Sequence, residues 1–174
     1  MKVIVADQFS PVGLEEMKSA GMDVYYDANL NGDSLTAKMA EVNPQVLVVR
    51  STKITAQQID AASNLQLVMR AGAGYDTIDF NYCSTKGIYV TNCPGKNANA
   101  VSELTMGLIL SIDRRIAEGV TMLKTGNWNK GMFAECRGIK GRTIGLIGFG
   151  NIAQRVCRAA RAFEMNVLVS TRTI

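Results

Sequence analysis

Short apolar runs alternate with amphipathic segments along the chain. The first run, Lys2-Val-Ile-Val-Ala6, predicts a buried strand, and Ser10-Pro11 after it predicts the start of a helix. Further apolar runs predict strands at 22–26, 45–49, 65–69 and 88–91. Helices are expected between them, ending at Val42 (capped by Asp33 or Ser34), at Ala62 (opened by the capping box 55–58) and at Lys86. This alternation is typical of a doubly wound α/β fold with a parallel sheet.

The pattern changes at Asn92-Cys-Pro-Gly-Lys-Asn97, where proline and glycine interrupt it. One long helix is predicted over 99–124, and a less regular arm over 128–142 follows it. We therefore expect a first domain at 1–98 and a second from 99 to 174. Five apolar residues share one face of the long helix and are expected in the core: Leu104, Leu108, Ile109, Ile112 and Ile116.

A glycine motif, Gly148-x-Gly150-x-x-Ala153, stands between an apolar run and a helical pattern. Gly148 allows a tight turn, Gly150 lets a pyrophosphate approach the backbone, and Ala153 is small enough for a helix to pack on a strand. A helix beginning near Asn151-Ile152 would direct free backbone N–H groups at the phosphates. The motif predicts binding of NAD or NADP, and the alternative is a purely structural strand-turn-helix.

The second domain has only two predicted strands, at 143–147 and 165–170. A Rossmann sheet normally has about six. The sequence thus predicts an incomplete Rossmann domain with uncovered apolar faces. Either the chain is truncated or a partner covers those faces.

Composition excludes several classes of protein. With 47% hydrophobic and 20% charged residues the chain is ordinary globular material. A net charge of +4 without basic runs argues against nucleic-acid binding, and no apolar run is long enough to span a membrane. Four cysteines without CxxC spacing favour reduced thiols in the cytoplasm over a zinc site.

Several motifs together resemble the D-isomer-specific 2-hydroxyacid dehydrogenases, and within that family the phosphoglycerate dehydrogenases most. They lie in the family's order along almost the whole chain: Val48–Lys53 (VVRSTK), Arg70–Asp76 (RAGAGYD), Lys86–Gly95 (KGIYVTNCPG), Asn97–Glu103 and the glycine motif. The resemblance implies a flavodoxin-like substrate domain followed by a dinucleotide-binding domain. It also implies a 2-hydroxy acid substrate, with 3-phosphoglycerate as the expected one, and a homodimer or larger assembly through the cofactor domain.

The resemblance also suggests where ligands bind. Arg50 and Ser51 follow a predicted strand, where an arginine can grip a phosphate or carboxylate, and a surface arginine is the alternative. Gly72, Ala73 and Gly74 form a small-residue turn whose amides suit a substrate carboxylate, or a plain tight turn. Asn97 and Val101 match the segment beside the nicotinamide.

The chain departs from the family in its expected ribose-binding acid. The position where that acid is expected, about 20 residues past the glycines, holds Thr171, and Arg172 follows it. Loss of the carboxylate and gain of a cation favour acceptance of the 2′-phosphate of NADP. We therefore expect NADP to bind at least as well as NAD.

The sequence contains no histidine. The family's catalytic arginine, carboxylate and histidine lie further along its chains, so no catalytic residue is assigned within 1–174. Three interpretations remain open: the leading portion of a dehydrogenase that oxidises 3-phosphoglycerate in serine biosynthesis, an inactive dinucleotide-binding scaffold, or a structural subunit that needs a partner.

Overall fold

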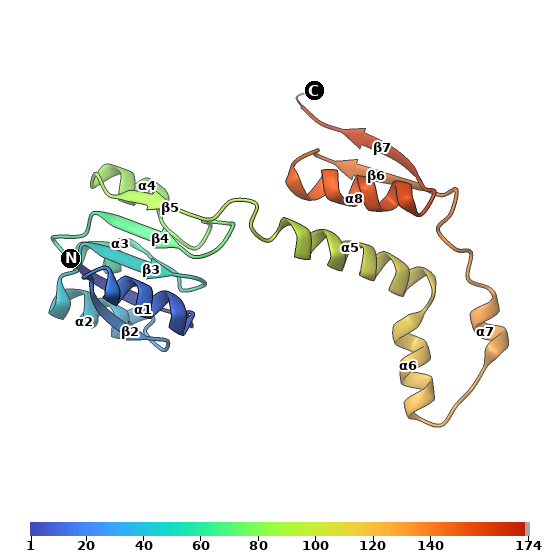
Figure 1. Ribbon diagram of the computed structural model, residues 1–174, viewed down its shortest axis with the longest axis horizontal. Coiled ribbons are helices and arrows are strands. Elements are labelled where there is room, and N and C mark those ends of the chain that lie inside the picture. The colour runs from blue at the N-terminus through green and yellow to red at the C-terminus, as the bar shows by residue number, and fades with distance from the viewer. Residues whose placement is uncertain (173–174) are drawn as a thin grey trace. The chain divides into compact units, whose positions relative to one another are not determined.

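The computed structural model describes residues 1–172. The chain divides into two compact units, Met1–Lys96 and Asn97–Ile174. The first unit contains β1 (Lys2–Ala6), α1 (Pro11–Ser19), β2 (Asp23–Asp27), α2 (Gly32–Val42), β3 (Val46–Val49), α3 (Ala56–Asp60), β4 (Leu67–Arg70), α4 (Phe80–Thr85) and β5 (Tyr89–Thr91) (Figure 1). Its five strands are all parallel, in the order β2-β1-β3-β4-β5. This is the flavodoxin-like order, and it confirms the predicted fold class.

Alternate residues of β1 and β3 point to opposite faces of the sheet and belong to two separate hydrophobic cores. Ile4 and Leu47 pack with residues of α2, α3 and α4, whereas Val3 and Val48 pack with Leu14 of α1. Both strands are buried on both faces, which explains why they are unbroken apolar runs in the sequence. Parallel register then brings the carboxyl ends of β1, β3 and β4 to one edge of the sheet.

The N-cap of α3 is the one predicted from the sequence, whereas the predicted N-cap of α2 is not. The predicted capping box opens α3, where the Gln58 side chain accepts a hydrogen bond from the Thr55 N–H at 3.0 Å. The prediction of Asp33 or Ser34 as the cap of α2 is wrong, because Asn31 is the N-cap. Ser34 instead sits in the first turn and accepts a hydrogen bond from the Asn31 N–H at 3.1 Å. Ser34 is therefore the N3 residue of a capping box and not the N-cap itself.

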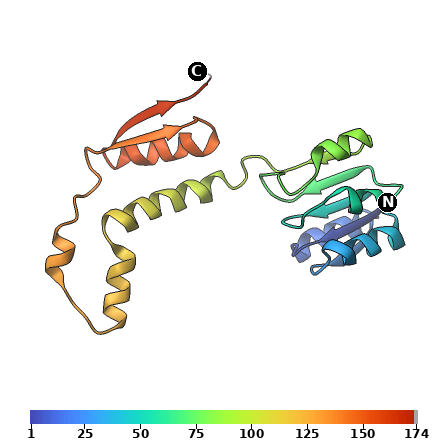
Figure 2. The ribbon, with the colours of Figure 1, turned by 180° about the vertical axis from the view of Figure 1, so that it is seen from behind.

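The second unit contains α5 (Ala98–Asp113), α6 (Ile116–Lys124), α7 (Lys130–Ala134), β6 (Thr143–Ile147), α8 (Asn151–Ala162) and β7 (Asn166–Ser170). Strands β6 and β7 are parallel neighbours, with α8 connecting them (Figures 1 and 2). Met106 of α5, Val156 of α8 and Ile139 form the small core. The predicted strand, glycine turn, helix and second strand are confirmed. Uncovered apolar surface is confirmed as well, because Ile147 is 97% and Leu168 is 66% exposed.

The single long helix predicted over 99–124 is wrong. The helix breaks at Arg114-Arg115, where Arg115 has a φ of +53°, and α6 begins at Ile116. A left-handed residue cannot continue an α-helix. The less regular arm also contains the short helix α7.

The expected buried stripe of the long helix is also wrong for four of its five members. Leu104, Leu108, Ile112 and Ile116 are all at least half exposed. Helix α5 instead packs through Ala98, Ser102 and Met106, at a spacing of four residues, with Ile109 beside them. Among the described residues of the second unit, no covering layer lies over the larger apolar face of the helix.

Candidate functional site

The structure brings the predicted anion-binding residues of the first unit to one edge of its sheet. Val49 of β3 lies opposite Arg70 of β4, so Arg50 and the 71–74 turn follow neighbouring strand ends. The Ala71 N–H donates to the Val49 carbonyl at 2.7 Å. Arg50 itself is exposed. This is the edge where ligands bind in open α/β sheets.

The turn at 71–74 offers fewer amides than its sequence suggests. The Gly72 N–H already donates to the Arg70 carbonyl at 2.8 Å. The N–H groups of Ala73 and Gly74 donate to no group within residues 1–172. Two of the three predicted residues therefore have backbone donors that are available for an anion.

Gly74 has a second reason to lack a side chain. A Cβ at this position would lie 2.6 Å from Nη1 of Arg70 and 2.9 Å from Oδ1 of Asp76. These two side chains form an ion pair at 3.5 Å, and Nε of Arg70 donates to the Arg50 carbonyl at 2.9 Å. The glycine thus makes room for an arginine that links the two strand ends. Sequence reasoning did not assign this role to Arg70.

Asp7 is the second residue that sequence reasoning did not assign. It directly follows β1, and its carboxylate accepts hydrogen bonds from the backbone N–H groups of residues 50–52 at 2.8–3.0 Å. The Ser51 hydroxyl also donates to it, at 3.1 Å. Ser51 therefore faces Asp7 in this structure. The available signal was a carboxylate placed immediately after a buried strand.

The hydrogen bonds to Asp7 determine its ionisation. Burial alone raises the pKa of the Asp7 carboxyl, but the backbone N–H donors of residues 50–52 favour the charged form more strongly. The pKa therefore lies below its ordinary value of 3.8. A lowered native pKa stabilises the fold above the unfolded-state pKa, and this stabilisation is lost as the pH falls through the native value. Asp7 is consequently a carboxylate at neutral pH.

In the second unit, the glycine motif forms the predicted turn between β6 and α8. Gly148 has a φ of +86°, which L side chains rarely adopt, and its N–H donates to the Ser170 carbonyl at 2.7 Å. Gly150 is the N-cap of α8, and Asn151 is the first helical residue. A Cβ built at Gly148 or Gly150 meets no atom within 4 Å. The space above both glycines is open.

The first turn of α8 supplies donors beside that space. The first bond of the helix ladder runs from the Gln154 N–H to the Gly150 carbonyl, at 3.0 Å. The N–H groups of Asn151, Ile152 and Ala153 therefore have no partner in the ladder. Three amides and the positive end of the helix dipole suit a pyrophosphate. The residues present fit a dinucleotide.

Asn97 and Val101 lie at the start of α5, which shares a core with α8. Asn97 is the exposed N-cap of α5, and its carbonyl accepts the Val101 N–H at 3.0 Å. Arg155 of α8 ties the two helix starts together, because it donates to the Asn99 side chain at 2.5 Å and to the Asn151 carbonyl at 2.7 Å. This link was not predicted.

Thr171 and Arg172 come directly after β7, and both are exposed. Ile147 lies opposite Ser170, so these two residues stand at the same strand edge as the glycine turn. That is the place of the ribose-binding position in a Rossmann fold. Neither residue carries a carboxylate.

Other kinds of site receive no support within residues 1–172. No cluster of cysteine, aspartate and glutamate there could hold a metal ion, and all four cysteines are free. None of the helices in that range has both the length and the apolar character needed to cross a bilayer.

Comparisons with known proteins identify relatives along almost the whole chain. The family model for the D-isomer specific 2-hydroxyacid dehydrogenase catalytic domain matches residues 3–173. A hydroxypyruvate reductase of Thermotoga maritima is 46% identical over 141 residues, covering 80% of this chain and 45% of its own. A D-3-phosphoglycerate dehydrogenase of Methanocaldococcus jannaschii is 37% identical, covering 97% of this chain and 32% of its own.

A solved structure is similar over the same range. The NAD⁺-bound 3-phosphoglycerate dehydrogenase of Entamoeba histolytica superposes with a TM-score of 0.78 at 28% identity, covering 100% of this chain and 55% of its own. The chain thus spans about a third to just over half of the length of these relatives. The resemblance inferred from the sequence motifs is confirmed: the chain belongs to the D-isomer-specific 2-hydroxyacid dehydrogenase family.

Proposed function

We propose that this chain supplies the leading part of an NAD(P)-dependent 2-hydroxyacid dehydrogenase. In this proposal the unit at 1–96 binds the substrate, and the unit from Asn97 onward begins the dinucleotide-binding domain. The observation that carries it is the open glycine turn at 148–150, with three unpaired amides at the start of α8. Family membership supplies the reaction class.

The proposed reaction oxidises a 2-hydroxy acid to a 2-keto acid. The C2–H bond breaks, its hydride passes to the nicotinamide, and the hydroxyl proton passes to a base. Bound dinucleotide would supply the hydride acceptor. Residues of this chain would hold the substrate's anionic groups, through the Arg50 guanidinium and the amides of Ala73 and Gly74, and the pyrophosphate, through 150–153. No residue within 1–174 is proposed as the base, since the chain has no histidine.

We propose 3-phosphoglycerate as the substrate, because phosphoglycerate dehydrogenases match almost the whole chain and Arg50 suits a phosphate. Reduction of hydroxypyruvate is the second candidate, favoured by the 46% identity to a hydroxypyruvate reductase. An assay of the complete protein, beside the 174-residue chain, tests both. A larger kcat/KM for 3-phosphoglycerate supports the first, and a larger value for hydroxypyruvate with a reduced dinucleotide supports the second.

A non-catalytic role is the remaining alternative, in which the chain binds dinucleotide or a partner as a scaffold. Absence of histidine is the feature that favours it. The same assay discriminates between the roles. Saturable dinucleotide binding by the complete protein, without turnover of either substrate, would support the scaffold and contradict the dehydrogenase.

We further propose that the protein accepts NADP at least as well as NAD. Thr171 removes a charge that would repel the 2′-phosphate, and Arg172 adds a cation close to it. Replacing Thr171 by aspartate should shift the ratio of the two dissociation constants toward NAD by about tenfold or more, because one charge-assisted hydrogen bond contributes about 1.5–3 kcal/mol. Arg172→Ala should raise the dissociation constant for NADP and leave that for NAD unchanged. A wild-type preference for NAD of about tenfold would contradict the proposal.

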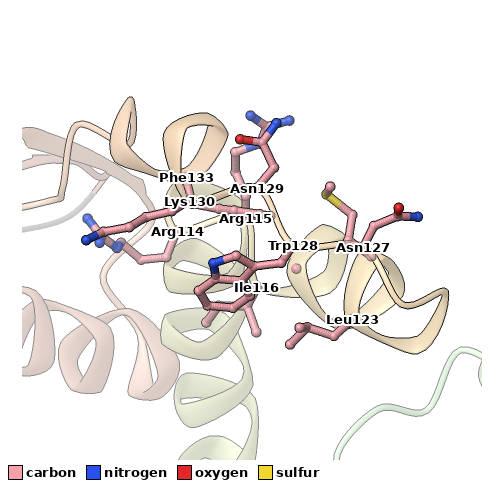
Figure 3. A pocket seen from close by; sticks show the side chains of 11 residues that line it. Arg114, Arg115, Ile116, Leu123, Asn127, Trp128, Asn129, Lys130 and Phe133 are labelled. Carbon is pink, nitrogen blue, oxygen red and sulfur yellow. The ribbon is translucent and has the colours of Figure 1, made fainter.

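A second copy of the chain is the proposed partner, through α5 and α6. Leu108, Ile112 and Leu123 are 54%, 78% and 57% exposed. Trp128, itself 77% exposed, lines a cavity of about 260 Å³ together with Ile116, Leu123 and Phe133 (Figure 3). Exposed large apolar residues gathered on one pair of helices are typical of an interface. Family resemblance supports a homodimer through the cofactor domain.

Sedimentation velocity tests the proposed interface. Wild-type protein should sediment as a dimer at micromolar concentration, and Ile112→Lys should sediment as a monomer, because a lysine in an apolar interface loses its hydration. Val12→Lys is the matched control, since Val12 is 67% exposed on α1 of the other unit. A monomeric wild type, or equal dissociation by the control variant, would contradict the interface.

A further inference from the structure

Asp7 has a backbone conformation that needs an explanation. Its φ is +108°, a region that L residues rarely adopt. Such strain persists only where surrounding contacts maintain it, and it is concentrated at functional positions. Asp7 directly follows β1, beside the end of β3, where the sheet order changes direction. The strained residue thus stands at the proposed substrate edge.

The strained backbone directs the carboxylate into the loop after β3. Oδ2 accepts the N–H groups of Arg50, Ser51 and Thr52 at 2.8, 3.0 and 3.0 Å, and Oδ1 accepts the Ser51 hydroxyl at 3.1 Å. Three successive N–H groups that converge on one point form an anion-binding nest. In this protein the nest is filled from within the chain.

Filling the nest has two consequences for a substrate. An anionic substrate group cannot use the amides of 50–52, so the Arg50 guanidinium and the amides of Ala73 and Gly74 are left to bind it. The loop is also held from both sides, because Nε of Arg70 donates to the Arg50 carbonyl at 2.9 Å. Both contacts are to the backbone of Arg50, which leaves its side chain available.

We propose that Asp7 is a positioning residue: its carboxylate fixes the loop at 50–52 and thereby sets the Arg50 side chain to bind the substrate's anionic group. The inference rests on the proposed function, because it assigns Asp7 to the substrate site of that reaction. Asp7 itself does not touch the substrate.

Asp7→Asn tests the proposal, because it keeps the side-chain shape and removes the charge. Amide hydrogen exchange at 50–52 should become about tenfold faster or more, while exchange at 46–49 stays unchanged. In the complete protein, KM for 3-phosphoglycerate should rise by about ten- to a hundredfold, since small misplacements of binding groups have effects of this size. The dissociation constant for dinucleotide should not change.

Two further variants keep the test decisive. Asp27→Asn is the matched control, because Asp27 ends the neighbouring strand β2 and its carboxylate accepts only the nearby Asn29 N–H, at 2.9 Å, among the hydrogen bonds of residues 1–172. Asp7→Gly removes the carboxylate and also relieves the strain, so it should reproduce the effects of Asp7→Asn even if that variant folds poorly.

The outcomes separate the inference from the proposed function. Faster exchange at 50–52 with an unchanged KM, or unchanged exchange in both Asp7 variants, would overturn the positioning role. A wild-type protein that turns over no 2-hydroxy acid would overturn the proposed function. The exchange data would then still show whether Asp7 holds the loop.

Discussion

Replacing Gly150 by valine is expected to weaken NAD(H) binding by about ten- to a hundredfold. A Cβ at this position meets no protein atom within 4 Å, so we expect the valine side chain to occupy the space proposed for the pyrophosphate. Overpacking of that kind costs about 1–3 kcal/mol, and each 1.4 kcal/mol is about tenfold in affinity. Gly150→Ala should give a smaller effect in the same direction. Titration with NADH measures both.

The control for this experiment is Gly107→Ala in α5, because a Cβ there also meets no atom within 4 Å. It should leave the dissociation constant unchanged. The free energy of unfolding of the Gly150 variants, measured by thermal denaturation, should fall by no more than about 1 kcal/mol, which is the usual cost of losing an N-cap residue. Wild-type affinity in Gly150→Val would contradict the assignment of the turn to the pyrophosphate.

Replacing Arg50 by alanine is expected to raise KM for 3-phosphoglycerate by about tenfold to a hundredfold. Hydrogen bonds to charged groups contribute about 1.5–3 kcal/mol each. Arg50 contacts Asp7 and Arg70 through its backbone N–H and carbonyl groups and not through its side chain. Truncating the side chain therefore leaves the loop's hydrogen bonds in place. Arg50→Lys should lie between wild type and alanine, since lysine keeps the charge but loses the paired donors. Steady-state kinetics of the complete protein measure the effect.

Lys53→Ala is the control for charge alone, because Lys53 is an exposed cation three residues further along. It should change KM little, and all three variants should bind NADH as the wild type does. An unchanged KM in Arg50→Ala would remove this residue from the substrate site. An equal rise in Lys53→Ala would show that general surface charge is responsible.

The parts of the fold that depend on local pattern could be predicted from the sequence. β1 and β3 are continuous apolar runs because both of their faces are buried. The glycine turn was predictable because only small residues fit the tight turn and the close packing between strand and helix. Sheet order followed from the alternation of strands and helices together with the family resemblance.

The features that sequence reasoning missed depend on contacts between distant segments. Asp7 meets residues 50–52 only because β3 lies beside β1 in the sheet, 43 residues further along. Arg115 breaks the long helix without a glycine or proline to signal it. The stripe at Leu104, Leu108 and Ile112 has the spacing of a core face, but α5 packs against α8 through its other side. Periodicity identifies an apolar face and does not say what covers it.

A crystal structure of the complete protein with NADH tests the central claim most directly. The account predicts pyrophosphate oxygens about 3 Å from the backbone N–H groups at the start of α8, above Gly148 and Gly150. A dinucleotide bound elsewhere, or a glycine turn that stays empty at saturating NADH, would contradict it.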